Sequence, residues 1–408
     1  MRSCRKKVFN KQPLSVGKGQ PRKQLPFIKK LAPVKNKKII VWLLKLFISW
    51  RLILLLITWV AVKLIPYKAG FLGGGEFAYQ LNPLYWAWAN FDGGYYLAIA
   101  RQGYLQFQQA FFPFYPLLIR FLARFLKDYL FSSLLISHLA FLAVMYLFYR
   151  LTKLDFGQKA ARMAVLFLLL FPTSFYFGSA YTEALFLALV LASFYAARRR
   201  AWLWMGIFGG LASATRLVGI FLLPALIVER WQAQKDGDRR WLDFWPLLLI
   251  LAGLVSYMVY LQKTVGDPLY FVHLQGFLKT GRTGGRIILP YQVCWRYLKM
   301  ICTTKADVLY FTVWLELLTS GLFLGLIIFS YRQIRLSYFI FMVLAYITPT
   351  LSGTFSSMPR YVLILFPGFM VLPLLVEKHS WFKRVYLFFA IILGMAAVML
   401  FTRGYWVA

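Results

Sequence analysis

The stretch IIVWLLKLFISWRLILLLITWVAVKLI, residues 39–65, decides the fold. It is apolar over more than the roughly 20 residues that an α-helix needs to cross a bilayer. It is also longer than a signal-peptide core of about 7–15 residues, and no small-residue cleavage site clearly follows it. We therefore expect this stretch to remain in the protein as a membrane anchor.

Apolar stretches of similar character recur from residue 39 to the C-terminus, and 61% of the 408 residues are hydrophobic. A soluble protein has roughly 45–50% apolar residues, so the sequence predicts an all-α polytopic membrane protein with about eleven transmembrane helices. The expected helices cover 39–65, 131–150, 160–178, 182–197, 202–215, 217–229, 244–262, 309–330, 336–351, 359–376 and 383–401. The segment 112–127 is apolar but carries three basic residues, and we expect it to lie along the outer membrane surface as an amphipathic helix.

The net charge of +34 does not indicate nucleic-acid binding, because much of it lies in the N-terminal arm. Residues 1–38 contain thirteen Lys or Arg and no acid, which predicts a disordered basic arm. Such an arm before a span indicates a cytoplasmic N-terminus and contacts with anionic lipid headgroups. We therefore divide the chain into this arm, 1–38, and a transmembrane domain, 39–408.

With the N-terminus inside, the inner connecting segments hold more Lys and Arg than the outer ones, as the positive-inside tendency requires. The two large outer segments are then 66–130 and 264–308. The charged residues predicted at membrane depth collect on this non-cytoplasmic side. We therefore expect a multi-pass integral membrane protein, located in the cell membrane if the source is bacterial.

Asp92 is the main candidate for a catalytic group. It lies in WANFDGGYY, residues 88–96, between the first span and the aromatic run FFPFYP, 111–116. Burial near lipid favours the neutral form of a carboxyl group and makes the carboxylate a stronger base. A helix N-cap or a solvated turn is the structural alternative.

Further candidates lie at the same predicted membrane face. Glu183 begins a helix, where an acid also has a purely structural use. Arg216 lies among apolar residues, and an arginine at such depth usually faces a cavity and a partner. Arg360 begins a span, where it could simply reach the interface.

The outer segment 264–308 provides the remaining candidates. His273 and Gln275 could contact a sugar or a phosphate, although a lone histidine is more often structural. Arg282 and Arg286 lie among glycines, a setting that suits a phosphate. A solvated basic loop is the alternative.

We expect no metal site, because no His, Cys and carboxylate cluster has ligand spacing. No Gly-rich nucleotide loop is present, so a nucleotide-fuelled pump is unsupported, and no cofactor is predicted. The three cysteines predict free thiols. If Cys294 and Cys302 share a helix, they are about 12 Å apart along its axis, too far for a disulfide.

Carboxylates, arginines and aromatic rings beside lipid suit transfer from a lipid-linked phosphate donor. Arginines would stabilise the departing phosphate, and a carboxylate would accept the proton of the attacking hydroxyl. A lipid or sugar transporter without chemistry is the alternative from another class. A transporter should carry charged residues that are reachable from both sides, so the one-sided pattern favours the enzyme.

The sequence also resembles the PIG-V family, that of GPI mannosyltransferase 2 and its bacterial relatives. The matching blocks are 91–96 (FDGGYY), 103–104 (GY), 111–116 (FFPFYP), 172–174 (PTS), 181–183 (YTE), 212–216 (ASATR) and 357–361 (SMPRY). They occur in the same order as in the family, and the resemblance covers nearly all of the chain from about residue 40. Family members commonly have Trp where Phe91 stands, a difference that could alter acceptor preference.

The resemblance implies a GT-C glycosyltransferase fold and a polyprenyl- or dolichyl-phosphate-mannose donor. It implies inverting transfer at the non-cytoplasmic face to a glycolipid or glycan acceptor, with Asp92 as the base. Glu183 would be a second acid or an acceptor contact. The donor phosphate would meet Arg216, Arg282, Arg286 and Arg360. A GT-C enzyme that uses another lipid-phosphate sugar remains the alternative within this class.

Overall fold

The computed structural model describes residues 37–235, 241–276, 282, 287–305 and 307–407, and no strand occurs among them. The helices of the first half are α2 (Lys37–Leu64), α3 (Gly75–Leu81), α4 (Pro83–Trp86), η1 (Ala87–Ala89), α5 (Asp92–Gln102), α6 (Phe114–Leu126), α7 (Tyr129–Leu169), η2 (Ser174–Gly178), α8 (Glu183–Arg198) and α9 (Trp202–Thr215). Those of the second half are η3 (Leu217–Phe221), α10 (Leu222–Lys235), η4 (Trp241–Leu248), α11 (Leu249–Thr264), α12 (Tyr270–His273), η5 (Leu274–Gly276), α13 (Pro290–Thr303), α14 (Val308–Ser330), α15 (Leu336–Thr350), α16 (Met358–Tyr361), η6 (Val362–Ile364), α17 (Phe366–Lys378) and α18 (Ser380–Thr402).

Among the described residues, five helices are long and apolar enough to cross a membrane. A sixth candidate arises if α16–η6 and α17, which are bent by 85°, form one broken span. These helices make the chain an integral membrane protein, and the count of eleven spans stays a prediction.

Several predicted helix boundaries are wrong. The break expected between the helices 131–150 and 160–178 is present, since α7 consists of two helical parts that meet at Gly157, whose φ of 81° suits glycine. That element ends at Leu169, and the separate turn η2 follows it. The first span begins at Lys37, two residues earlier than expected. The segments predicted to be outer also contain short helices whose bounds were not predicted (α3, α4, α5, α12 and α13). Those in the first of these segments agree with the surface-lying helices expected there.

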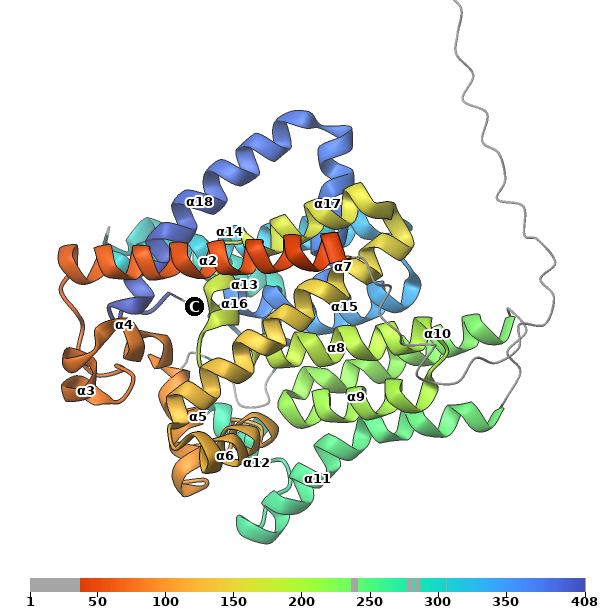
Figure 1. Ribbon diagram of the computed structural model, residues 1–408, viewed down its shortest axis with the longest axis horizontal. Coiled ribbons are helices and arrows are strands. Elements are labelled where there is room, and N and C mark those ends of the chain that lie inside the picture. Colours follow the sequence, from red (N-terminus) through yellow and green to blue (C-terminus); the bar gives the residue numbers. More distant parts are fainter. Residues whose placement is uncertain (1–36, 236–240, 277–281, 283–286, 306, 408) are drawn as a thin grey trace, which may run out of the picture. The chain divides into compact units, whose positions relative to one another are not determined.

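Helix α9 packs closely between α8 and α11, and all three run beside one another in Figure 1. Small residues permit this approach. A Cβ atom on Gly253 of α11 would collide with the carbonyl oxygen of Gly210 in α9, and one on Gly206 would collide with Pro246. Small residues at helix contacts let backbones come together where lipid supplies no hydrophobic driving force. The tight packing fixes Arg216, which follows α9 directly.

The segment predicted to lie along the surface forms the helix α6, which packs against α5 and α7. Its Arg120 donates from Nε to the carbonyl of Ala100 at 2.7 Å and from Nη2 to that of Ile99 at 3.0 Å. A basic side chain that binds the last carbonyls of a helix stabilises its C-terminus. In this way α6 fixes the end of α5, the helix that begins with Asp92.

Candidate functional site

Asp92 follows a backbone turn that few residues adopt. Phe91 has φ 57° and ψ −121°, a sparsely populated conformation for a residue with a side chain. Such strain persists only where the surroundings hold it. Phe91 donates its N–H to the carbonyl of Phe71 at 2.8 Å, and its ring packs on Phe71 and Trp406. The turn thus sets the direction in which Asp92 leaves the backbone.

Asn90 connects this turn to three other segments, and it was not recognised in the sequence. It is fully buried. Its Nδ2 donates to the carbonyl of Phe401 at 2.8 Å, and its Oδ1 accepts the N–H of Gly73 at 2.8 Å. Its own carbonyl accepts the hydroxyl of Tyr181 at 2.8 Å. Buried amides satisfied in this way specify a unique local arrangement.

Arg360 meets both predicted acids. Its Nη1 donates to Oδ2 of Asp92 at 2.5 Å, and its Nε lies 3.5 Å from Oε1 of Glu183. The side chain of Arg360 is 8% exposed and that of Asp92 22%. Two segments that are 268 residues apart in the sequence thus meet at one ion pair.

Glu316, in α14, supports the segment that carries Arg360. Its Oε1 accepts the N–H of Ser357 at 3.1 Å, and its Oε2 accepts the hydroxyl of Tyr297 at 2.5 Å. Ser357 has φ 66° and immediately precedes α16. Glu316 was not recognised in the sequence, although an acid within an apolar span was a usable signal.

Arg216 reaches the same acid from another element. It ends α9 with an extended backbone, φ −153° and ψ 146°, and its Nη1 donates to Oε1 of Glu183 at 2.7 Å. The Glu183 side chain is 2% exposed and that of Arg216 is 14% exposed. Glu183 therefore lies between two guanidinium groups, and the prediction that Arg216 has a partner is confirmed.

Arg282 joins the group through Tyr361. Its Nη2 donates to the Tyr361 hydroxyl at 2.7 Å and to the carbonyl of Ser356 at 3.0 Å. We call the five residues Asp92, Glu183, Arg216, Arg282 and Arg360 the outer cluster. All five were singled out in the sequence, and the structure brings them together.

Pairing in the outer cluster is incomplete. It sets three guanidinium groups against two carboxylates. Within the described part of the chain, the buried atoms Oε2 of Glu183 and Nε of Arg360 make no hydrogen bond. Buried polar groups without partners are costly, so their presence indicates a site that is completed by a ligand. The excess of arginine favours an anionic ligand with several oxygens, since guanidinium groups bind phosphate through charge-assisted hydrogen bonds.

Aromatic rings line the outer cluster. The Arg360 guanidinium lies 5.7 Å from the ring centroid of Tyr176 and 5.4 Å from that of Tyr181. These rings exclude water and thereby strengthen the electrostatic interactions inside the site.

The other predicted site residues are not joined to the outer cluster by a contact in the described chain. His273 pairs instead with Asp267, Nδ1 to Oδ2 at 2.7 Å, and this hydrogen bond lowers the pKa of Asp267. Gln275 lies in η5. Arg286 lies outside the described residues. Roles for these three in sugar or phosphate binding stay predictions.

The sequence predicted free cysteines and no metal site. Cys294 and Cys302 both lie in α13 and are free and exposed, as the sequence predicted. No group of three His, Cys, Asp or Glu that could hold a metal comes together in the described ranges.

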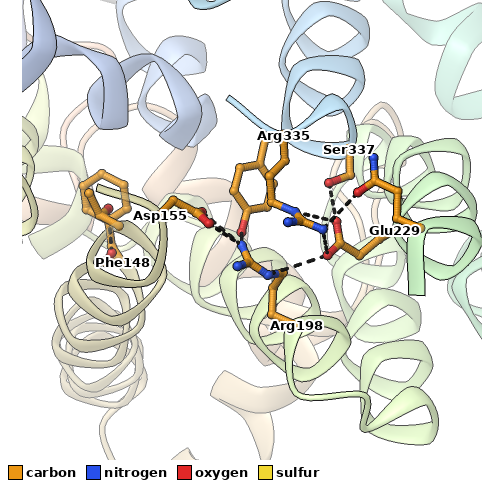
Figure 2. A network of polar contacts seen from close by, with 9 residues as sticks. Phe148, Asp155, Arg198, Glu229, Arg335 and Ser337 are labelled. Carbon is orange, nitrogen blue, oxygen red and sulfur yellow. Dashed lines mark hydrogen bonds and ion pairs between the residues drawn. The ribbon is translucent and has the colours of Figure 1, made fainter. Parts of the chain in front are cut away.

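A second group of charged residues joins α7, α8, α10 and the start of α15 (Figure 2). Asp155 accepts from Arg198 with both oxygens, at 2.7 and 3.0 Å. Glu229 accepts from Arg335 with both oxygens, at 2.9 and 3.2 Å, and from Ser337 at 2.6 Å. We call Asp155, Arg198, Glu229 and Arg335 the inner cluster. Its two acids and two arginines match in number, which is typical of a structural ion network.

Comparison with known proteins extends these observations. A family model described as dolichyl-phosphate-mannose-protein mannosyltransferase matches residues 110–261, less than half of the chain. A search of curated proteins gives no match.

Among solved structures, the chain is similar to ArnT from Cupriavidus metallidurans bound to undecaprenyl phosphate. The identity is 15% and the TM-score 0.49, over 83% of this chain and 62% of ArnT. It is also similar to the oligosaccharyltransferase of Archaeoglobus fulgidus tethered to an acceptor peptide. That identity is 14% and the TM-score 0.44, over 89% of this chain and 55% of the other. The chain thus covers less than two thirds of either protein. The described helices confirm the predicted all-α membrane fold. The GT-C type stays a prediction.

Proposed function

We propose that the protein is a membrane mannosyltransferase of the PIG-V kind. It would move mannose from a polyprenyl- or dolichyl-phosphate donor to a lipid-linked or glycan acceptor at the non-cytoplasmic face. The observation that carries this proposal is the outer cluster, in which Arg216 and Arg360 pair with two acids, Arg282 joins through Tyr361, and buried polar atoms stay unpaired. The name of the matched family, which refers to dolichyl-phosphate-mannose, supports the choice of donor.

The geometry supports the following chemistry. The acceptor hydroxyl gives its proton to Asp92 while its oxygen attacks the anomeric carbon of the sugar. The bond from that carbon to the phosphate oxygen breaks on the opposite face, so the configuration inverts. The departing lipid phosphate keeps the bonding electron pair, and the arginines stabilise its charge where it develops.

Arg360 would link the two halves of this reaction. In the structure its Nη1 donates a hydrogen bond to Oδ2 of Asp92, so it holds the carboxylate in place before substrates bind. A bound phosphate offers this guanidinium an alternative anionic partner. Once Arg360 turns to the phosphate, the Asp92 oxygen is free to accept the proton of the acceptor hydroxyl.

A cavity of about 640 Å³ supports a lipid-linked substrate. It lies between α5, α6, α9 and α11, and its lining is mainly apolar. Ala214, two residues before Arg216, lines it, as does Ile99 of the helix that begins with Asp92. An apolar chain in this cavity would be close to the elements that carry the charged groups.

Transfer from defined donors tests the proposal. Purified protein in lipid vesicles would receive radiolabelled polyprenyl-phosphate-mannose, the corresponding glucose and arabinose donors, or a nucleotide-linked mannose, together with a membrane glycolipid extract. We expect label to reach the glycolipid from polyprenyl-phosphate-mannose alone and expect no transfer by Asp92→Asn. Transfer from another lipid-phosphate sugar would correct the sugar. Uptake of label into vesicles without a new glycosidic bond would identify a transporter.

A further inference from the structure

Tyr361 occupies the centre of the arginines in the outer cluster. It is the last residue of α16 and directly follows Arg360. The guanidinium carbons of Arg216, Arg282 and Arg360 lie 5.3, 5.0 and 5.4 Å from the centroid of its ring. These arginines come from three separate parts of the chain, so one ring is a shared contact for all of them.

The three arginines differ in how their charge is balanced. Arg216 pairs with Glu183 and Arg360 pairs with Asp92. In the described chain, Arg282 has no carboxylate oxygen within ion-pair distance. Its contacts are the Tyr361 hydroxyl, the Tyr361 ring and a backbone carbonyl. Its direct contacts are therefore with neutral groups, and the buried Glu316 acts on it only as a more distant charge.

Electrostatics explains why a tyrosine suits this position. Three cations around one point repel one another, and a low-dielectric setting strengthens that repulsion. The face of an aromatic ring carries partial negative charge and attracts guanidinium groups. The hydroxyl oxygen adds an acceptor for Arg282. Tyr361 thus keeps the arginines together without adding a carboxylate that would compete with an incoming phosphate.

We propose that Tyr361 is a positioning residue that holds Arg216, Arg282 and Arg360 as a preformed receptor for the phosphate of the lipid donor. This inference rests on the proposed function and deepens it. Tyr361 acts through the arginines, and the acceptor site does not depend on it. A receptor assembled in advance binds more tightly, because its side chains need not be ordered when the ligand arrives.

Two substitutions separate the contributions of the ring and the hydroxyl. Tyr361→Phe keeps the ring and removes the acceptor for Arg282. Tyr361→Leu removes both. Tyr338→Phe is the matched control, since Tyr338 is also buried and its hydroxyl also accepts from an arginine, Arg198, at 3.0 Å in the other cluster.

The experiment measures binding of a short-chain polyprenyl phosphate to each detergent-purified protein by calorimetry. Steady-state kinetics follow, with donor and acceptor varied in turn. We expect Tyr361→Phe to weaken phosphate binding about tenfold, the loss of one charge-assisted hydrogen bond. Tyr361→Leu should weaken it further. The KM for the donor should rise accordingly, the KM for the acceptor should change less than about twofold by the same relation, and Tyr338→Phe should behave as wild type.

The outcomes are distinguishable. If wild type binds polyprenyl phosphate and Tyr361→Phe binds it equally well or better, the role of Tyr361 is refuted and the proposed function stands. A change in the acceptor KM alone also refutes it. If wild type itself neither binds polyprenyl phosphate nor uses a lipid-phosphate donor, the proposed function fails and this inference fails with it. Tyr361→Phe retains the buried ring, so the test does not depend on whether Tyr361→Leu folds.

Discussion

Helix α8 has the outer cluster at its first residue, Glu183, and the inner cluster at its last, Arg198. The two ends are about 22 Å apart at 1.5 Å per residue. At the Arg198 end, all four oxygens of Asp155 and Glu229 accept hydrogen bonds. At the Glu183 end, one carboxylate oxygen and one guanidinium nitrogen have no hydrogen-bond partner in the described chain.

This difference distinguishes buried charges that stabilise the fold from buried charges that can bind a ligand. Breaking a fully matched buried pair leaves an uncompensated charge, so such a network resists change. An incompletely paired group can accept a ligand that supplies the missing contacts. Perturbed and buried ionisable groups occur in both settings, so burial alone does not identify a site, and it is the pairing that differs between these two clusters.

The largest expected effect is on catalysis at the outer end. Asp92→Asn keeps the shape of the side chain but removes its ability to accept a proton. Loss of a general base typically costs about 10²–10⁴-fold in rate. Transfer by the purified variant should fall by that factor while its thermal unfolding stays near that of wild type. Asp155→Asn, at the inner end, is the matched control and should retain its turnover. Full activity of Asp92→Asn would remove Asp92 from the mechanism.

The next largest effect is on stability at the inner end. Glu229 is 3% exposed and accepts from both Arg335 and Ser337. Glu229→Ala leaves arginine charge uncompensated, and removal of one partner from a buried pair costs about 3–5 kcal/mol. The thermal unfolding temperature in detergent should fall, while turnover per folded molecule is unchanged. If turnover fell with stability intact, the inner cluster would have a functional role and the comparison of the two ends would break down.

A smaller effect is expected from a substitution in the outer cluster that keeps the charge of an arginine but changes the geometry of its hydrogen bonds. Arg216→Lys retains the positive charge but loses the planar guanidinium that can bind phosphate through two parallel hydrogen bonds. One lost charge-assisted hydrogen bond is worth about 1.5–3 kcal/mol, which corresponds to a roughly tenfold to hundredfold weaker interaction with the donor. Kinetics with donor and acceptor varied in turn measure this. Arg198→Lys, in the inner cluster, should alter stability without changing the donor KM. An effect of Arg216→Lys on the acceptor KM alone would assign Arg216 to the acceptor.

Much of this site could be predicted from the sequence, because acids and arginines in apolar surroundings are conspicuous. Asp92, Glu183, Arg216 and Arg360 were identified in that way. The pairing of Arg360 could not be predicted, since Arg360 lies in α16, which together with η6 is bent by 85° from α17. The partner of His273 was not predicted either, although Asp267, the acid with which it pairs, lies only six residues earlier.

The inner cluster and Glu316 were missed for a different reason. Asp155 and Glu229 stand close to basic residues near predicted span ends, where a charge in solvent is the ordinary expectation. Only the packing of α7, α8, α10 and α15 buries them together. Glu316 stands alone within an apolar run, and its use, to hold the N–H of Ser357, is visible only in three dimensions.

The smallest expected effect on activity is that of single cysteines introduced for thiol labelling. Their labelling tests whether the two clusters face opposite sides of the membrane. Segments that are predicted to lie on the same side of the membrane contact one another in the structure. Asp92 pairs with Arg360, and Glu229 pairs with Arg335. Leu105 and Gln333 are exposed residues in segments predicted to be outer and inner.

Each would be changed to Cys in a protein whose three native cysteines are replaced by Ser. An impermeant thiol reagent added to whole cells should label Leu105→Cys and should label Gln333→Cys only after the membrane is opened. Both proteins should keep their transferase activity, because neither position contacts a cluster in the described chain. Labelling of both positions from outside would overturn the predicted topology, and the two clusters would then differ in pairing without differing in the side of the membrane they face.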